Sequence, residues 1–267
     1  MELIDTHAHL YLPEFDEDRE DMIARAMAVG VNRFYLPNVD SRTIDAMLQL
    51  EAAYPSHCFA MMGLHPCSVK DNWEEELDIV KAWLERRRFV AIGEIGIDLY
   101  WDTTHVAAQQ QAFLRQVEWS LEYDLPIVIH SRESTDMLID ILRDLREPRL
   151  KGIFHCFGGT VAQAEAIIEL GFLLGIGGVL TFKKSGLDAV LAQIDLQHLV
   201  LETDSPYLAP APHRGKRNES AYLRLVADKL AEVKQVPLEE ITSITTGNAN
   251  KLFSPKGKAI EPSRQAI

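Results

Sequence analysis

The stretch Ile4-Asp5-Thr6-His7-Ala8-His9-Leu10 ends a short apolar run with two histidines spaced two residues apart. Because side chains of a β-strand alternate between its two faces, His7 and His9 are expected to point the same way. Two neutral imidazoles on one face can bind the same metal ion. Two polar residues at a strand end would give the same pattern, so the metal-site hypothesis needs further ligands from the rest of the chain.

Four later apolar runs also end in a residue that can bind a metal. The runs are residues 89–94, 126–130, 152–155 and 199–204, and they end in Glu94, His130, His155 and Asp204. One histidine after a strand is typical of a hydrogen-bonded core residue, but recurrence at five strand ends indicates a built site.

Strand-like and helix-like patterns alternate along the whole chain, which is typical of the α/β class. Further strands are expected at residues 34–37, 58–63 and 172–177. Helices are expected at residues 22–27, 44–53, 73–86, 106–122, 135–145, 161–169, 187–194, from 221 onward and at 238–253. Eight strand–helix repeats with continuous apolar strands predict a (β/α)8 TIM barrel. A doubly wound open sheet is the alternative, but a barrel brings all five ligand-bearing strand ends to one mouth.

Length and composition agree with a single globular domain. The 267 residues are 47% hydrophobic and 25% charged, and no linker-like segment divides them. We expect one barrel domain at residues 1–253 and a mobile C-terminal tail at residues 254–267. The chain has no apolar run of membrane length and no secretory signal pattern. Its three cysteines form no Cys-x-x-Cys pair, so we expect a cytoplasmic protein.

The balance of charge restricts the kinds of partner. Lysine and arginine number 27 against 40 acidic residues, a net charge of −13, which argues against broad coating of nucleic acid. A nucleic-acid enzyme is still allowed, because bound cations and a few local basic residues can receive a phosphate. One basic concentration near strand ends fits such a phosphate clamp, with a solvated loop as the alternative: Arg132, His213, Arg214, Lys216 and Arg217.

The predicted ligands outnumber the three or four that one catalytic metal takes from protein. They are His7, His9, Glu94, His130, His155 and Asp204. We therefore expect two divalent ions bridged by Glu94, one held by His7, His9 and Asp204 and the other by His130 and His155. Such a pair can activate water and stabilise both reacting oxygens of a phosphate ester, and Asp204 can take a proton from the water. Glu94 and Asp204 are therefore the expected catalytic residues.

Several ordered motifs across nearly the whole chain resemble the TatD-type metal-dependent hydrolases. They are Asp5-Thr6-His7-Ala8-His9, Gly63-Leu64-His65-Pro66, Gly93-Glu94-Ile95-Gly96-Ile97-Asp98, Ile129-His130-Ser131-Arg132, His155-Cys156-Phe157-Gly158-Gly159, Glu202-Thr203-Asp204-Ser205-Pro206 and Pro212-His213-Arg214-Gly215-Lys216-Arg217-Asn218. The resemblance implies a TIM barrel with divalent metals and a phosphodiesterase-like activity on DNA, often as a 3′-to-5′ exonuclease. It also implies metal ligands at the positions named above. The tail beyond Phe253 falls outside it.

Four further residues are candidates for secondary roles. His65 is expected to contact a substrate phosphate or a metal-bound water. Glu202 lies on the same strand face as Asp204 and is expected to orient a histidine or arginine beside the substrate. Tyr100 and Trp101 follow Glu94 closely and can stack on a base or simply pack.

The sequence thus predicts a hydrolase of phosphodiester bonds in single-stranded or damaged DNA ends, without a membrane partner. It does not fix the oligomeric state, for which a monomer is favoured. The metals are expected to be Zn, Mn, Ni or Mg. A small-molecule amide, lactone or aminoacyl-ester hydrolase on the same metals is the alternative, since a metal pair also activates water for attack on a carbonyl. A metal-stabilised binding protein without turnover is the third reading, and the complete ligand set argues against it.

Overall fold

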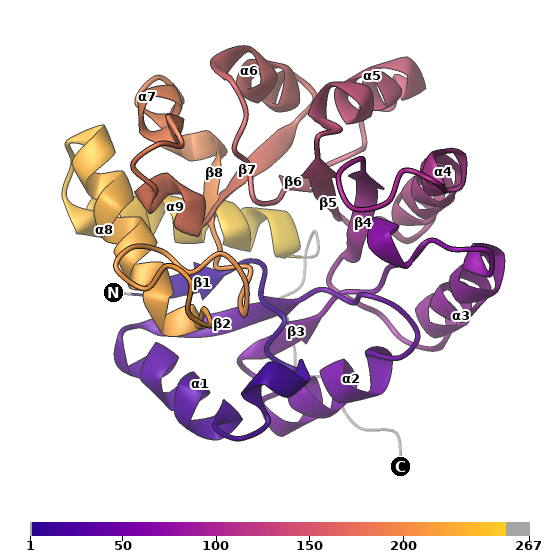
Figure 1. Cartoon of the computed structure of the whole chain (residues 1–267), viewed down its shortest axis with the longest axis horizontal. Coiled ribbons are helices and arrows are strands. Elements are labelled where there is room, and N and C mark those ends of the chain that lie inside the picture. The colour runs from indigo at the N-terminus through magenta and orange to yellow at the C-terminus, as the bar shows by residue number, and fades with distance from the viewer. Residues whose placement is uncertain (1, 255–267) are drawn as a thin grey trace.

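Eight strands lie inside a ring of helices in the computed structural model, which describes residues 2–254 (Figure 1). The strands are β1 (Leu3–Asp5), β2 (Val31–Leu36), β3 (Cys58–Ala60), β4 (Ile92–Asp98), β5 (Ile127–Arg132), β6 (Gly152–Phe154), β7 (Phe172–Ile176) and β8 (Leu199–Leu201). The helices are α1 (Arg19–Ala28), α2 (Ile44–Ala53), α3 (Trp73–Arg86), α4 (Val106–Tyr123), α5 (Thr135–Leu145), α6 (Val161–Glu169), α7 (Leu187–Leu191), α8 (Leu223–Lys234) and α9 (Leu238–Phe253). Short 3-10 turns lie at Pro13–Phe15, Pro66–Ser68, Gly178–Thr181, Leu196–His198 and Ser220–Tyr222.

The strands follow one another in chain order, and every pair is parallel. One run joins β1, β2 and β3, and a second joins β4 through β8. Two parallel bridges close the ring between these runs, Met62 with Ile92 and Ala8 with Ser205. The backbone N–H of Thr6 also donates to the carbonyl oxygen of Leu201 over 3.0 Å. The predicted (β/α)8 barrel is confirmed, and with it the convergence of the carboxyl ends of the strands at one mouth.

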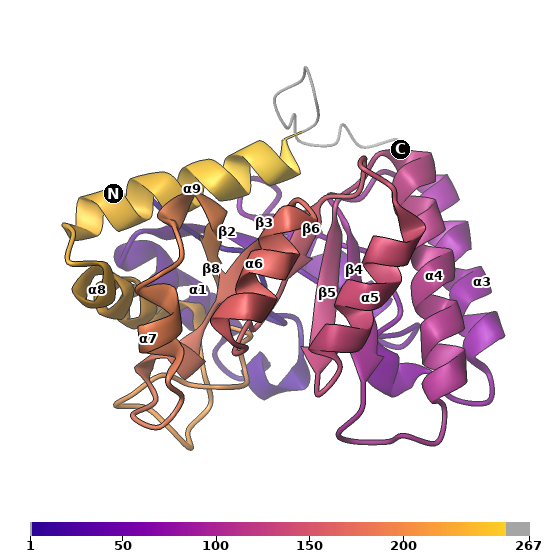
Figure 2. The same ribbon diagram turned by 90° about the horizontal axis from the view of Figure 1, so that it is seen from above.

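Two layers of apolar side chains hold the barrel together. The strand faces that point outward pack against the helices, and the inward faces fill the barrel with a smaller cluster that includes Tyr35, Val128 and Val200. The last helix, α9, covers the end of the barrel opposite the mouth at which the carboxyl ends of the strands converge (Figure 2). Its residue Phe253 stacks on Tyr35 with ring centroids 3.9 Å apart. One end is therefore closed by apolar packing, and the other carries the loops.

The strand that carries Glu94 departs from the sequence pattern. We expected it to end at Glu94, but β4 continues to Asp98 and places Glu94 inside the strand. It continues because Ile95 and Ile97 are fully buried. The backbone also approaches β5 closely at Gly96, where a Cβ atom would lie 2.0 Å from the carbonyl oxygen of His130.

Smaller differences lie at the ends of elements. The strand β1 ends at Asp5, before His7, and α7 ends at Leu191 rather than at residue 194. The predicted tail, residues 254–267, lies outside the described residues apart from Ser254. Within the part of the chain that the structure describes, no helix has the length and apolar character needed to cross a membrane.

Candidate metal centre

The side chain of Glu94 is the point on which the predicted ligands converge. Its carboxylate is 2% exposed and faces five imidazole rings. Oxygen Oε2 lies 3.1 Å from His7 Nε2 and 3.5 Å from His9 Nε2. Oxygen Oε1 lies 2.7 Å from His155 Nε2, 2.9 Å from His130 Nδ1 and 3.4 Å from His65 Nε2. The two oxygens of one carboxylate thus face two different sets of histidines.

The backbone after β1 points His7 and His9 to the same side, although neither lies within the strand. Ala8, between them, pairs with Ser205 beyond β8, which keeps the segment extended. The hydroxyl of Tyr11 donates to the carbonyl of Pro37, so its oxygen is free to accept from His9 Nδ1, 3.0 Å away. This contact favours the tautomer of His9 whose Nε2 lone pair faces Glu94. Tyr11 is a positioning residue that the sequence analysis missed.

Asp204 lies across the site from Glu94, beyond the end of β8. Its Oδ1 is 3.6 Å from Nε2 of both His7 and His9, and its side chain is 14% exposed. The backbone of Asp204 has φ of 55°, in the left-handed region that aspartate tolerates better than most residues. Burial opposes ionisation, but the nearby imidazoles of His9, His155 and His7 hold the pKa of Asp204 below its usual value.

Behind His155 lies Glu202, which is fully buried. Its Oε1 is 3.6 Å from His155 Nδ1 and accepts from the backbone N–H of Cys156. A Cβ atom at position 175 would lie 2.2 Å from Glu202 Oε2, so only Gly175 leaves room for this carboxylate. With no exposed surface, Glu202 is placed to orient His155 rather than to touch a substrate.

A second orienting carboxylate, Asp98, was not assigned a role from the sequence. Its Oδ2 lies 2.8 Å from His130 Nε2, which turns the other ring nitrogen, Nδ1, toward Glu94. Its Oδ1 accepts from the backbone N–H groups of Tyr100, at 2.9 Å, and Trp101, at 2.8 Å. Asp98 and Glu94 are four residues apart on one strand, and the period of two that places them on one face could have revealed Asp98.

The donor set fits divalent metal ions. A carboxylate has about four lone-pair positions, so five imidazoles exceed what Glu94 can satisfy by hydrogen bonding. Burial alone would lower the pKa of His155, yet Glu94 and Glu202 raise it well above its usual value. The negative potential that favours a proton on this ring also favours a cation at its nitrogen. Among residues 2–254, three groups have ligand atoms within 4.8 Å of one another: His7, His155 and Asp204; His7, His9 and Glu94; and His65, Glu94 and His130.

His65 therefore lies among the ligand candidates, where the sequence had suggested contact with a substrate phosphate or a metal-bound water. The predicted pairing of His130 with His155 is also geometrically close, at 3.5 Å between His130 Nδ1 and His155 Nε2.

Comparison with known proteins places the chain among metal-dependent hydrolases. The model of the family "TatD related DNase" matches residues 4–254. The chain belongs to the TatD-related DNase family. The metal-dependent hydrolase YabD of Bacillus subtilis (strain 168) is 39% identical over 252 residues, which cover 94% of this chain and 98% of the relative. The crystal structure of YjjV, a TatD homologue of Escherichia coli K12, superposes with a TM-score of 0.89 at 33% identity and covers 94% of this chain and 97% of that one.

One relative in the TatD family carries a named activity. The "3'-5' ssDNA/RNA exonuclease TatD" of Salmonella typhimurium (strain LT2) is 30% identical over 257 residues. The alignment covers 94% of this chain and 98% of the relative. The resemblance that the motifs had indicated is thereby confirmed, and this TatD-family chain is a metal-dependent hydrolase.

The predicted phosphate clamp of this TatD-family protein is only partly available to a substrate. Arg217 forms a bidentate ion pair with Asp18, with N–O distances of 2.7 and 2.8 Å. His213 stacks on Tyr222, with ring centroids 4.0 Å apart. Arg214 is exposed and lies over the ring of Phe182, 3.9 Å from its centroid.

The other two clamp residues are exposed. They are Arg132, which lies 4.6 Å from the centroid of the Tyr100 ring, and Lys216.

Two lysines that the sequence analysis did not single out complete the basic surface. Lys183 and Lys184 follow β7 and line a hollow of about 560 Å³ together with Arg214. Within the described residues, none of these three cations, nor Lys216, has an ion-pair partner. The adjacent lysines were visible in the sequence, but only the fold places the loop after β7 beside the loop after β8.

Proposed function

We propose that this protein hydrolyses phosphodiester bonds of single-stranded DNA through two divalent ions bridged by Glu94. The observation that carries the proposal is the division of its carboxylate, with Oε2 facing His7 and His9 and Oε1 facing His130 and His155. A carboxylate that binds through both oxygens can hold two ions at the spacing of about 3.5–4 Å found in two-metal hydrolases. His65 adds a third nitrogen on the Oε1 side.

Bound ions at this position would lower the pKa of a water and stabilise negative charge on the attacking and leaving oxygens. The protein's own groups supply the rest. Asp204 is ionised at neutral pH, because neighbouring histidines hold its pKa low, and it is the only carboxylate of the set with substantial exposure. It can therefore accept the proton of the attacking water and pass it to solvent. Asp98 holds the ring of His130 by a hydrogen bond, and the buried carboxylate of Glu202 faces Nδ1 of His155 over 3.6 Å.

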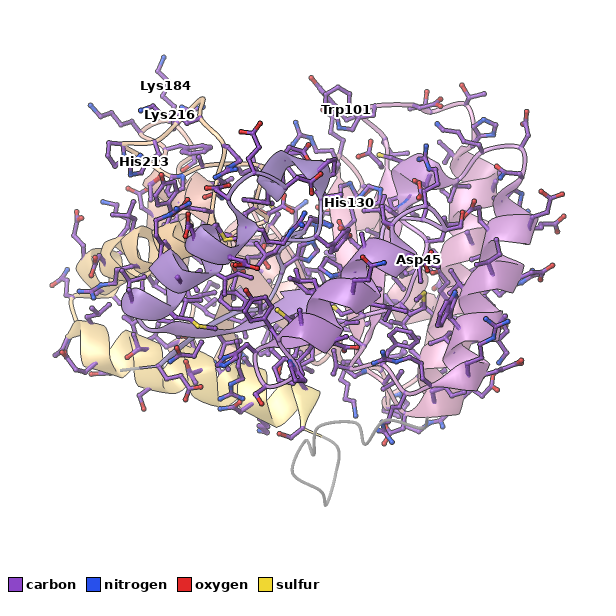
Figure 3. All side chains as sticks on the ribbon, turned by 90° about the horizontal axis from the view of Figure 1, so that it is seen from below. Asp45, Trp101, His130, Lys184, His213 and Lys216 are labelled. Carbon is purple, nitrogen blue, oxygen red and sulfur yellow. The ribbon has the colours of Figure 1, made fainter. Side chains whose placement is uncertain are left out.

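The choice of nucleic acid as substrate rests on the basic surface and on the named relative. Lys184 and Lys216 project from the same end of the barrel as His130, opposite α9 (Figure 3). Unpaired cations at this end, on a chain of net charge −13, fit a short phosphate backbone better than a neutral ester. The exonuclease activity for which the Salmonella relative is named agrees with this substrate.

Turnover by the metal-loaded protein tests the proposal. Single-stranded DNA labelled at the 3′ end, or at the 5′ end, is incubated with protein loaded with Mn²⁺ or Zn²⁺ or stripped by a chelator. A panel of neutral carboxylic esters and lactones is run in parallel. The proposal predicts metal-dependent release of nucleotides that exceeds ester hydrolysis. Faster turnover of esters or lactones, with DNA left intact, would contradict it and favour carbonyl chemistry.

A further inference from the structure

Three exposed aromatic side chains lie at the metal-site end of the barrel. Trp101 is 71% exposed, and Tyr100 and Tyr207 are each 50% exposed. The first two follow β4, and Tyr207 follows β8, three residues beyond Asp204. The indole of Trp101 projects from the same end of the molecule as Lys184 and Lys216 (Figure 3). Leaving an indole in water forgoes the burial energy that such side chains usually supply, which points to a binding partner.

The backbone that carries Tyr100 and Trp101 is fixed at both ends. Asp98 Oδ1 accepts both of their backbone N–H groups, at 2.9 and 2.8 Å. On the far side, Asp102 forms an ion pair with Lys70 at 2.6 Å. The two aromatic rings meet edge to face with centroids 4.9 Å apart. The exposure of Trp101 is therefore part of a held conformation.

The same Asp98 carboxylate links these aromatic residues to the metal centre. Its second oxygen, Oδ2, contacts His130, whose other ring nitrogen faces Glu94. The carboxylate of Asp98 thus connects the backbone of Tyr100 and Trp101 to the predicted metal ligand His130. Arg132 lies over Tyr100 and adds positive charge beside the aromatic pair.

We propose that Trp101, whose ring meets that of Tyr100 edge to face, forms a stacking platform for an unpaired base next to the phosphate at the metal centre. The proposal rests on the proposed function, since it names the part of a nucleic-acid substrate that this surface receives. A base in a duplex is already stacked and paired, so the platform selects single-stranded ends. The flanking phosphates would then run toward Lys183, Lys184 and Arg214. Stacking on an aromatic ring is tolerant of base identity, so no strong sequence preference is expected.

A binding cycle tests the platform without requiring turnover. The ligand is a single-stranded phosphorothioate oligonucleotide that resists hydrolysis, either with all its bases or with one abasic unit moved through the terminal three nucleotides. Its Kd is measured by fluorescence anisotropy for the metal-loaded wild type, Trp101→Ala, Trp101→Phe and the control Ile79→Ala. Ile79 is 39% exposed on α3, one of the helices that surround the barrel. Metal content confirms that each variant keeps its site.

We expect Trp101→Ala to raise the Kd at least about fivefold and Trp101→Phe to restore most of the affinity. At one position of the oligonucleotide, the abasic unit should raise the Kd of the wild type by a similar factor. The same unit should leave the Kd of Trp101→Ala almost unchanged. An unchanged Kd for Trp101→Ala would overturn the platform. So would a result in which the effects of the substitution and of the abasic unit on Kd multiply at every abasic position, because the two changes would then act independently. Failure of the proposed function looks different: binding follows the expected cycle, but native DNA is not hydrolysed.

Discussion

The substitution Glu94→Gln tests the bridging role most sharply, because it preserves shape while removing charge and one ligand atom. The amide NH2 only donates hydrogen bonds, so one of the two faces loses its oxygen ligand completely. The other face keeps an oxygen but loses the negative charge that now lies 2.7–3.5 Å from five imidazoles. We expect metal content to fall from about two ions per chain to below about one. Hydrolysis should fall at least about hundredfold.

Metal content is measured by elemental analysis after gel filtration, and hydrolysis on end-labelled single-stranded DNA. The matched control is Glu118→Gln, the same change on the exposed face of α4. Circular dichroism checks that both variants fold. If Glu94→Gln retained two ions per chain and near-native turnover, the bridging role would be refuted.

Three further predictions concern the base, the core and the basic surface. Asp204→Asn should leave a folded protein whose hydrolysis is at least about hundredfold slower, the low end for losing an acid–base group, and a near-native rate would remove Asp204 from the mechanism. Phe253→Ala should lower the free energy of unfolding in urea by about 3 kcal/mol, because Phe253 is buried against Tyr35 at the closed end of the barrel; a loss below about 1 kcal/mol would show that α9 contributes little there. Replacing Lys183 and Lys184 together with alanine should weaken binding of single-stranded DNA and reduce its slope against log salt by about 1.4, and an unchanged slope would separate these lysines from the phosphates.

The strands and helices could be predicted because their signals are local. The apolar runs mark all eight strands, and the helical period locates α3 at Trp73–Arg86 and α5 at Thr135–Leu145, the same bounds that the structure has. The end of β4 could not be placed in this way. Burying Glu94 within a strand is stable only because histidines from other segments of the chain surround it, and the sequence pattern of one segment does not contain those contacts.

For the site, too, some residues could be predicted from the sequence and others could not. Residues such as His7, His130 and Asp204 could be proposed as ligands because parallel strands in a barrel bring their carboxyl ends together. The ion pair of Arg217 could not be predicted, because its partner Asp18 is 199 residues away in the chain. The hollow lined by Lys183 likewise depends on how two loops meet, and loop conformation follows from tertiary contacts that periodicity does not encode.

A metal titration coupled to turnover tests the central claim most directly, since it asks whether hydrolysis of DNA needs both ions. Protein stripped by a chelator receives Mn²⁺ in steps, and at each step bound metal and hydrolysis of end-labelled single-stranded DNA are measured on the same sample. The two-ion centre bridged by Glu94 predicts little hydrolysis up to one equivalent and a steep rise as the second ion binds. Full hydrolysis at one equivalent, or none at two, would contradict it.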